Sequence, residues 1–334
     1  MFKNKNIIIT GGTGSFGKKF VEIVLKKFNP KKLIIYSRDE LKQYEMKIHY
    51  GKKYKNLRFF LGDVRDKDRL KFAFREVDYV IHAAALKQVD TAEYNPMECL
   101  KTNVNGAENV IDACLHNKVK KVIALSTDKA VNPINLYGVT KLASDKLFIS
   151  ANLLSGNLGT KFSVVRYGNV VGSRGSVLPL FKKFIKQNKK TLPITHKDMT
   201  RFWITLDEGV NFVLKNFNRM IGGEIFIPII PSIKITDLAK SMGKNIKTKI
   251  IGIRPGEKIH ESLCSVDEAE NVRRVKDHLV IIPNFIKKNK KTNYIDRQGN
   301  KGVKVSKNFE YNSGTNKDFL NIKQIKELNN KIIL

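Results

Sequence analysis

The sequence predicts an α/β protein built on a doubly wound parallel sheet, with a smaller mixed α/β domain after it. The first half alternates short β-branched runs with longer helical patterns, as crossovers between parallel strands require. A glycine-rich turn joins the first of these runs directly to the first helical pattern. After about residue 170 the rhythm changes, because prolines at 179, 193, 228, 231, 255 and 283 separate shorter elements.

Six strands and the helices between them are predicted in chain order. The strands are Asn6–Thr10, Lys32–Tyr36, Leu57–Leu61, Tyr79–Ala83, Lys121–Ser126 and Lys161–Tyr167. The helical patterns are Phe16–Lys27, Asp66–Phe74, Pro96–Asn117 and Leu136–Ser155.

The chain is divided into a first domain of residues 1–170 and a second of residues 171–334. Because the strand-like run Glu224–Ile230 can return to either sheet, the boundary is expected to be interleaved. Residues 286–315 are polar and rich in lysine, which predicts a loosely structured surface segment before a last short helix.

Length and composition indicate a globular protein of the reducing cytoplasm. The 334 residues are 42% hydrophobic, and no apolar run approaches the roughly 20 residues that cross a bilayer. Cys99, Cys114 and Cys264 have no paired spacing, as expected where disulfides do not form. The six histidines show no metal-ligand spacing, so no metal site is predicted.

The formal net charge of +31 raises the alternative of a nucleic-acid binder. The basic residues are 49 Lys against only 13 Arg, and they are spread along the whole chain. Base readout relies on Arg, and no basic stripe interleaved with aromatic residues is present. We therefore expect no nucleic-acid partner, although the charge favours an anionic substrate.

The glycine-rich turn predicts a dinucleotide site. The strand Asn6–Thr10 leads into Gly11-Gly12-Thr13-Gly14-Ser15-Phe16-Gly17 and then a helix. This context allows the backbone to approach a pyrophosphate at the helix N-terminus.

The end of the second strand bears on the choice of dinucleotide. Ser37 lies 20 residues beyond Gly17, where an NAD site would place a carboxylate. Ser37 followed by Arg38 suits a 2′-phosphate instead, and NADP is predicted. Asp63 is placed to accept from the adenine amino group, and Ala83 is small enough for the cofactor to pass closely.

Two pairs of residues predict the chemistry. Tyr137 and Lys141 lie at i and i+4 of one helical face, where the ammonium favours the phenolate that removes a hydroxyl proton. Asp128 and Lys129 follow the strand that ends at Ser126, where open α/β sheets bind ligands. Acid and base roles there require the pKa of Asp128 to rise and that of Lys129 to fall.

These motifs together resemble the inverting UDP-N-acetylglucosamine 4,6-dehydratases, which open the bacterial pseudaminic acid pathway and belong to the extended short-chain dehydrogenases/reductases. The resemblance runs from about residue 5 to residue 265, with a weaker echo at Phe309–Asn316. It rests on Thr10–Gly17, Ser37–Lys42, His82–Lys87, Ser126–Lys141, Val165–Val177, Met199–Gly209 and Ile251–Lys258.

The resemblance implies a lyase that oxidises C4 transiently with NADP, loses water across C5 and C6, and inverts C5. The product would be UDP-2-acetamido-2,6-dideoxy-β-L-arabino-hex-4-ulose. A dimer-based homo-oligomer, up to a hexamer, is also implied.

Residue roles follow from the same resemblance. The catalytic residues would be Thr127, Asp128, Lys129, Tyr137 and Lys141. The UDP-sugar would be held by Lys87, Asn169, Arg174, Val177, Arg201, Arg254 and Glu257, mostly in the second domain. The cofactor would contact Gly11, Thr13, Gly14, Ser15, Phe16, Gly17, Ser37, Arg38, Asp39, Glu40, Leu41, Lys42, Asp63, Val64, Ala83, Lys87, Tyr137, Lys141 and Val170.

Three alternatives remain open at this point. A retaining 4,6-dehydratase would share the cofactor chemistry, but many of those enzymes carry Glu in the place of Lys129. A UDP-hexose 4-epimerase would not need the pair Asp128 and Lys129, because it loses no water. An NADP-sensing protein without catalysis would commonly lack the pair Tyr137 and Lys141.

Overall fold

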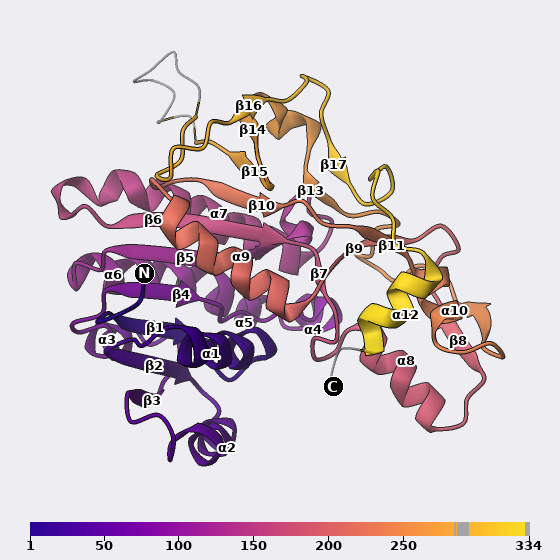
Figure 1. Ribbon diagram of the computed structural model, residues 1–334, viewed down its shortest axis with the longest axis horizontal. Coiled ribbons are helices and arrows are strands. Elements are labelled where there is room, and N and C mark those ends of the chain that lie inside the picture. Colours follow the sequence, from indigo (N-terminus) through magenta and orange to yellow (C-terminus); the bar gives the residue numbers. More distant parts are fainter. Residues whose placement is uncertain (284, 286–293, 331–334) are drawn as a thin grey trace.

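A ten-stranded, mostly parallel sheet forms the centre of the computed structural model, which describes residues 1–283, 285 and 294–330 (Figure 1). The strand order is β16-β14-β15-β10-β6-β5-β4-β1-β2-β3. The run from β3 to β10 is parallel throughout, whereas β15, β14 and β16 add antiparallel pairs. The predicted α/β fold with a doubly wound parallel sheet is therefore confirmed.

The first six strands match the predicted ranges, with ends that differ by no more than one residue. Ile7, Ile8 and Ile9 of the first strand are completely buried, as expected for a central strand covered on both faces. Each such side chain contributes about 1.5–3 kcal/mol through burial. The strands are β1 (Asn6–Thr10), β2 (Lys32–Ser37), β3 (Leu57–Leu61), β4 (Tyr79–His82), β5 (Lys121–Thr127) and β6 (Lys161–Tyr167).

Helices cover both faces of this sheet (Figure 1). On one face α1 (Ser15–Lys27) packs beside α9 (Leu206–Arg219), with α2 (Glu40–Tyr50) near the β3 edge. On the other face lie α3 (Lys67–Ala73), α6 (Gly106–His116) and α7 (Leu136–Leu154). Helix α2 and the short α4 (Val89–Tyr94) were not predicted from the sequence.

The helical pattern predicted over residues 96–117 is interrupted. It forms α5 (Pro96–Leu100), a π-helical turn (Lys101–Asn105) and then α6. The turn directs Asn103 toward the loop after β4, where its Oδ1 accepts from the backbone N of Leu86 at 2.8 Å and its Nδ2 donates to the Leu86 carbonyl at 2.9 Å. The wider turn thus fixes the loop that borders the cavity described below.

A second group of elements lies beside the carboxyl ends of the parallel strands (Figure 1). It has its own apolar core around Phe181, Trp203 and Leu238. Its strands are β7 (Asn169–Val170), β9 (Thr200–Ile204) and β11 (Ser232–Lys234) in one sheet, and β8 (Thr191–Ile194) with β12 (Lys247–Ile250) in another. Its helices are α8 (Val177–Lys186), α10 (Ile235–Ser241) and α12 (Ile322–Asn330).

The chain returns from this group to the central sheet. β10 (Ile225–Pro228), within the run Glu224–Ile230 that could have joined either sheet, pairs in parallel with β6. Three antiparallel strands then extend the sheet: β14 (Val272–Val275), β15 (His278–Ile281) and β16 (Val303–Lys304). The division into domains at residue 170 stays a prediction. After that residue the chain passes more than once between the second group of elements and the central sheet.

The prediction of a loose surface segment over residues 286–315 holds only in part for residues 294–315, which are largely exposed but attached by buried anchors, while 286–293 lie outside the described residues. Tyr294 and Tyr311 are buried, and the Tyr311 hydroxyl donates to the Ile230 carbonyl at 2.8 Å. β17 (Tyr311–Asn312) pairs with β13 (Ser262–Cys264). The polar composition concealed these anchors, because few apolar residues suffice to attach the segment.

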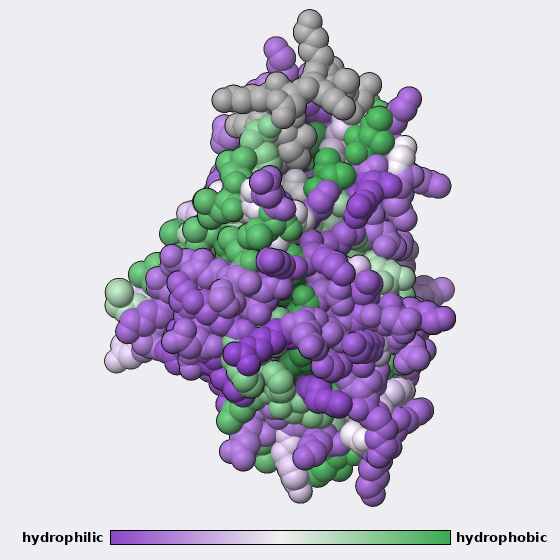
Figure 2. Space-filling view, turned by 90° about the vertical axis from the view of Figure 1, so that its left-hand side faces the viewer, coloured by the Kyte–Doolittle hydropathy of each residue, from purple (hydrophilic) through white to green (hydrophobic). Residues whose placement is uncertain are grey.

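The surface is largely hydrophilic on the side that Figure 2 shows, with hydrophobic residues in smaller areas between. This agrees with a lysine-rich chain whose charges are solvated. Within residues 1–283, 285 and 294–330, no helix combines the length and apolar character needed to cross a bilayer.

Candidate active site

The turn between β1 and α1 is shaped to hold an anion. Gly11 has a φ of +68°, and a Cβ there would lie 2.8 Å from the backbone N of Ala84, so glycine alone fits. Gly14, the N-cap of α1, has no side chain to occupy the N–H groups of the first turn, which contains no acidic residue. These N–H groups border the cavity and carry partial positive charge. This cradle fits the pyrophosphate of a dinucleotide.

The end of β2 presents a hydroxyl and a guanidinium. Ser37 is buried, and its Oγ accepts from Nε2 of Gln43 at 3.1 Å. The Arg38 side chain is 51% exposed and lies 3.4 Å from the carboxylate of Asp63. A half-exposed guanidinium beside the end of β2 leaves donors for a phosphate group.

The neighbouring predicted residues mostly interact with one another. Asp39 caps α2 by accepting from the backbone N of Lys42 at 2.9 Å, and its carboxylate also pairs with the Lys42 ammonium. Burial would raise the pKa of Asp63, but hydrogen bonds from Arg65 and the charge of Arg38 outweigh it and lower that pKa. Asp63, which is expected to accept from adenine, thus also forms ion pairs with two arginines.

One cavity of about 640 Å³ brings the two groups of elements together. Every predicted catalytic residue and every predicted UDP-sugar residue lines it. Part of the predicted cofactor set lines it too: Gly11, Gly14, Ser15, Phe16, Gly17, Ala83, Lys87, Tyr137, Lys141 and Val170. The remainder lies outside its lining: Thr13, Ser37, Arg38, Asp39, Glu40, Leu41, Lys42, Asp63 and Val64.

Tyr137 and Lys141 lie on α7 at the base of this cavity. Burial raises the pKa of Tyr137 to about 12, and the Lys129 charge and a hydrogen bond with Thr127 oppose that rise. Nζ of Lys141 donates to the Leu125 carbonyl at 2.7 Å, which ties α7 to β5. Burial also lowers the pKa of Lys141.

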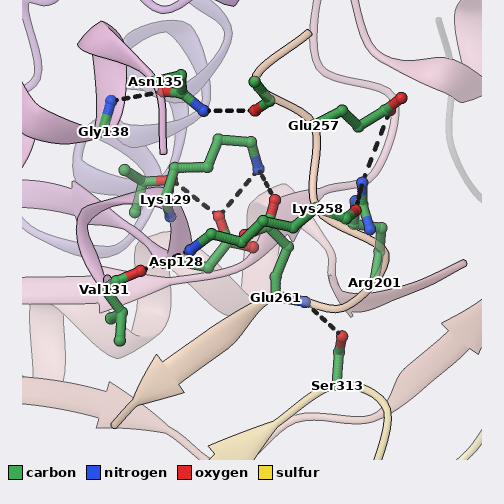
Figure 3. Close-up of polar contacts among 12 residues, drawn as sticks. Asp128, Lys129, Val131, Asn135, Gly138, Arg201, Glu257, Lys258, Glu261 and Ser313 are labelled. Carbon is green, nitrogen blue, oxygen red and sulfur yellow. Dashed lines mark hydrogen bonds and ion pairs between the residues drawn. The ribbon is translucent and has the colours of Figure 1, made fainter. Parts of the chain in front are cut away.

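Asp128 and Lys129 form a buried ion pair at the end of β5. Nζ of Lys129 lies 3.1 Å from Oδ1 of Asp128 and 3.1 Å from Oε1 of Glu261, so it bridges two carboxylates (Figure 3). Oδ1 of Asp128 also accepts from the Thr127 hydroxyl at 3.0 Å. Its Oδ2 is buried without a hydrogen-bond partner among the described residues.

The charge states of this pair agree only partly with prediction. Burial raises the pKa of Asp128, and the charge of Glu261 adds to that rise, as the acid role requires. The pKa of Lys129 does not show the fall that the base role requires and that burial against the substrate was expected to provide. Burial does act to lower it, but Asp128 and Glu261 outweigh burial and raise it.

Three arginines predicted to bind the diphosphate differ in their surroundings. Arg201 is buried, and its guanidinium donates to the carbonyls of Thr200, Lys258 and Ile259 at 2.7–3.0 Å. The Arg254 side chain is 59% exposed and lies 3.3 Å from Glu257.

Arg174 borders the same cavity, on the loop after β7. It is exposed, and its backbone N donates to Oγ of Ser15 at 3.4 Å. Of the three arginines, Arg174 and Arg254 therefore keep the greater freedom to meet a ligand.

Two further predicted residues have features that suit a polar ligand. Oδ1 of Asn169 is buried and accepts no hydrogen bond from the part of the chain that the structure describes. Burial lowers the pKa of Lys87, and the nearby Arg174 and Lys129 charges act in the same direction. Three like charges facing one cavity favour an anion in it.

Glu261 was not among the predicted site residues, although Glu257 of the same segment was. Residues 256–261 cross the cavity and are attached to it: Asn135 donates to the Gly256 carbonyl at 2.8 Å, and Nζ of Lys258 donates to the Val131 carbonyl at 2.7 Å (Figure 3). Glu261 follows the Ile251–Lys258 motif by three residues, but nothing in its own sequence neighbourhood distinguishes it. Among the described residues, no group of His, Cys, Asp and Glu could hold a metal ion.

The Rossmann-like sheet, the glycine cradle and the facing tyrosine and lysine define the class of extended short-chain dehydrogenases/reductases. The chain belongs to the family described as polysaccharide biosynthesis protein, which matches residues 7–283.

Proteins similar to the chain cover nearly its whole length. The UDP-N-acetylglucosamine 4,6-dehydratase (inverting) of Campylobacter jejuni subsp. jejuni serotype O:23/36 is 57% identical over 99% of this chain and 98% of that protein. A UDP-glucose 4-epimerase of Rickettsia felis is 43% identical over 98% of this chain and 96% of its own. The crystal structure of Pen from Bacillus thuringiensis is 36% identical, with a TM-score of 0.87 and coverage of 98% of both chains.

Proposed function

We propose that the chain is an inverting UDP-N-acetylglucosamine 4,6-dehydratase, a hydro-lyase that forms UDP-2-acetamido-2,6-dideoxy-β-L-arabino-hex-4-ulose. The observation that carries the proposal is the pair Asp128 and Lys129, an acid and an amine 3.1 Å apart in the cavity that also contains Tyr137. The Campylobacter relative, at 57% identity, bears the same name.

The first half of the reaction is assigned to α7. Tyr137 takes the proton of the C4 hydroxyl, and the charges of Lys129 and Lys141 nearby favour its phenolate. Lys129 is among the groups that lower the pKa of Tyr137, whereas Asp128 acts to raise it, so the lysine of the dehydration pair also assists the oxidation step. Bound NADP would supply the acceptor of the C4 hydride and the donor of the hydride that later enters C6.

The second half is assigned to the end of β5. A ketone at C4 acidifies the C5 proton, which Lys129 in its neutral form removes. Asp128, whose pKa burial raises, protonates the C6 hydroxyl so that water leaves. Return of a proton to C5 on the opposite face inverts that centre.

The UDP moiety is assigned to the second group of elements. Arg174, Arg201 and Arg254 would neutralise the diphosphate, and Glu257 would accept from ribose hydroxyls. Lys87, Asn169 and Val177 would complete the sugar-nucleotide site, since they line the same cavity.

NADP is proposed in preference to NAD because Arg38 follows Ser37 at the end of β2. Replacing Arg38 by alanine should weaken NADPH binding by roughly 10- to 100-fold, the loss of one charge-assisted contact, and leave NADH binding unchanged. Titration of the purified variant with each dinucleotide measures both dissociation constants. Equal weakening of both, or of neither, would contradict the assignment.

The direct test is incubation of the purified chain with UDP-N-acetylglucosamine. We expect loss of one water by mass spectrometry and, by NMR, a 4-keto-6-deoxy sugar with inverted C5. In D₂O, deuterium should appear at C5. A 4-keto product with unchanged C5 configuration would replace the proposal by a retaining dehydratase.

A UDP-hexose 4-epimerase is the second candidate, favoured by the Rickettsia relative of that name at 43% identity. Epimerisation conserves the mass of the sugar and needs no acid at C6. A product of unchanged mass with inverted C4 would therefore favour this candidate.

The oligomeric state, the cellular location and the partners are also part of the proposal. We propose a dimer-based homo-oligomer in the cytoplasm, acting on a small nucleotide sugar without a nucleic-acid or membrane partner. Sedimentation at several protein concentrations tests the oligomer.

A further inference from the structure

Glu261 is a buried carboxylate to which neither half of the proposed mechanism gives a role. Its side chain is 3% exposed, and its Oε1 lies 3.1 Å from Nζ of Lys129 (Figure 3). Its Oε2 is buried and has no hydrogen-bond partner within the described residues. Burying a carboxylate here costs free energy unless the charge of a neighbouring cation, which is Lys129, compensates it.

Hydrogen bonds with the C-terminal part of the chain hold the backbone around Glu261. The N of Glu261 donates to Oγ of Ser313 at 2.9 Å, and the N of Ser313 donates to the Glu261 carbonyl at 2.8 Å. Oγ of Ser313 also lies 2.8 Å from Oγ1 of Thr200. Residues 309–316, which weakly resemble the dehydratases, thus fix the Glu261 carboxylate at the cavity, although they lie about 50 residues further along the sequence.

Two carboxylates share one lysine in this arrangement. With Asp128 as the sole counter-ion, the Lys129 ammonium would hold Asp128 ionised and unable to protonate a leaving hydroxyl. Glu261 provides a second counter-ion, and its negative charge also repels a charge on Asp128. The trio can then hold a protonated Asp128 beside a Lys129–Glu261 ion pair, and transfer of the Lys129 proton to Glu261 across their 3.1 Å contact leaves the neutral amine that removes the C5 proton.

We infer that Glu261 is a positioning residue for dehydration, which holds Nζ of Lys129 and supplies the counter-charge that lets Asp128 keep its proton. This inference rests on the proposed function. It assigns the two carboxylates different tasks: Asp128 acts on the substrate, and Glu261 acts through its neighbours.

The inference predicts the direction of a pH shift. Removing the charge of Glu261 lowers the pKa of both Asp128 and Lys129, because a nearby negative charge favours the protonated form of each. Both limbs of the dehydration profile should therefore move to lower pH. The other charged or titratable groups facing the trio remain in place: Arg201, Lys258, Lys87 and Tyr137.

The experiment measures dehydration of UDP-N-acetylglucosamine against pH in the wild-type chain and in Glu261→Gln, which keeps the side-chain shape. We expect the profile of the variant to be shifted to lower pH by about one unit or more. Glu261→Asp keeps the charge and should return the profile toward wild type. Glu327→Gln, which removes an exposed carboxylate of α12, should leave it unchanged.

The outcomes separate this inference from the proposed function. Absence of dehydration in the wild-type chain would contradict the function itself. A Glu261→Gln profile that is lower at every pH but not shifted would overturn the inference alone. If Glu261→Gln is folded but inactive throughout, activity in Glu261→Asp supports a role of the charge, whereas inactivity of both folded variants contradicts it.

Discussion

Replacing Lys129 by methionine should stop the reaction at the C4 ketone, with formation of the 6-deoxy product reduced at least roughly 10³-fold. Methionine fills a similar volume but cannot remove the C5 proton. Oxidation at C4 depends on Tyr137 and should continue, though more slowly, since Lys129 helps to lower the pKa of that phenol. Quenched reactions should contain a 4-keto sugar that keeps its C6 hydroxyl and takes up no deuterium at C5.

The same substitution should reduce stability in a pH-dependent way. Without the ammonium, Asp128 and Glu261 become a buried pair of acids, and breaking such a site costs about 3 kcal/mol at neutral pH. Their pKa values in the folded chain would lie above those in the unfolded chain. The cost is therefore smallest near pH 4 or below, as a rough guide, and grows as the pH rises.

The control for this prediction is Lys146→Met, which removes an exposed lysine from α7. It should behave as wild type in turnover and in thermal unfolding. Bound dinucleotide, measured after gel filtration, should be the same in both variants. Near-normal turnover in Lys129→Met would mean that another group removes the C5 proton.

Replacing Tyr137 by phenylalanine should prevent even the first step. The ring remains in its buried place, but the oxygen that receives the C4 proton is gone, so turnover should fall by about 10³- to 10⁴-fold. In contrast to Lys129→Met, no 4-keto sugar should be recovered on quenching. The Michaelis constant should change little, because the cavity lining keeps its shape.

Tyr94→Phe is the matched control, since Tyr94 is 87% exposed and takes no part in the cavity. Its turnover should equal that of wild type. Recovery of a 4-keto sugar from Tyr137→Phe at the wild-type rate would exclude Tyr137 as the base and leave Thr127 as the neighbouring hydroxyl to examine.

Local sequence patterns were sufficient for the parallel half of the fold. Hydrophobic runs such as Ile7–Ile9 are buried on both faces, and Gly11 and Gly17 in the turn that follows occupy positions where a side chain would collide with backbone. The pairs Asp128 and Lys129, and Tyr137 and Lys141, could be located because each is short-range in sequence. Their convergence on one cavity follows from the meeting of strand ends at one sheet edge.

Charge states could not be predicted in the same way. Burial against the substrate was expected to lower the pKa of Lys129, whereas Asp128 and, distant in sequence, Glu261 together outweigh burial and raise it. The same limitation applies to residues 294–315, where Tyr311 and Ser313 make contacts that composition does not reveal. Long-range pairings of single polar residues leave no periodic pattern to detect.

The path of the chain between its two groups of elements bears on how such enzymes could be recombined. A fragment ending near residue 170 would leave β6 without its partner β10 and expose unpaired backbone groups along that edge. It would also lose α9, where Phe217 packs against Phe2 with ring centroids 5.4 Å apart. Exchanging substrate preference with a relative would therefore require grafting discontinuous loops, because no single cut releases the group of elements to which we assign the sugar nucleotide.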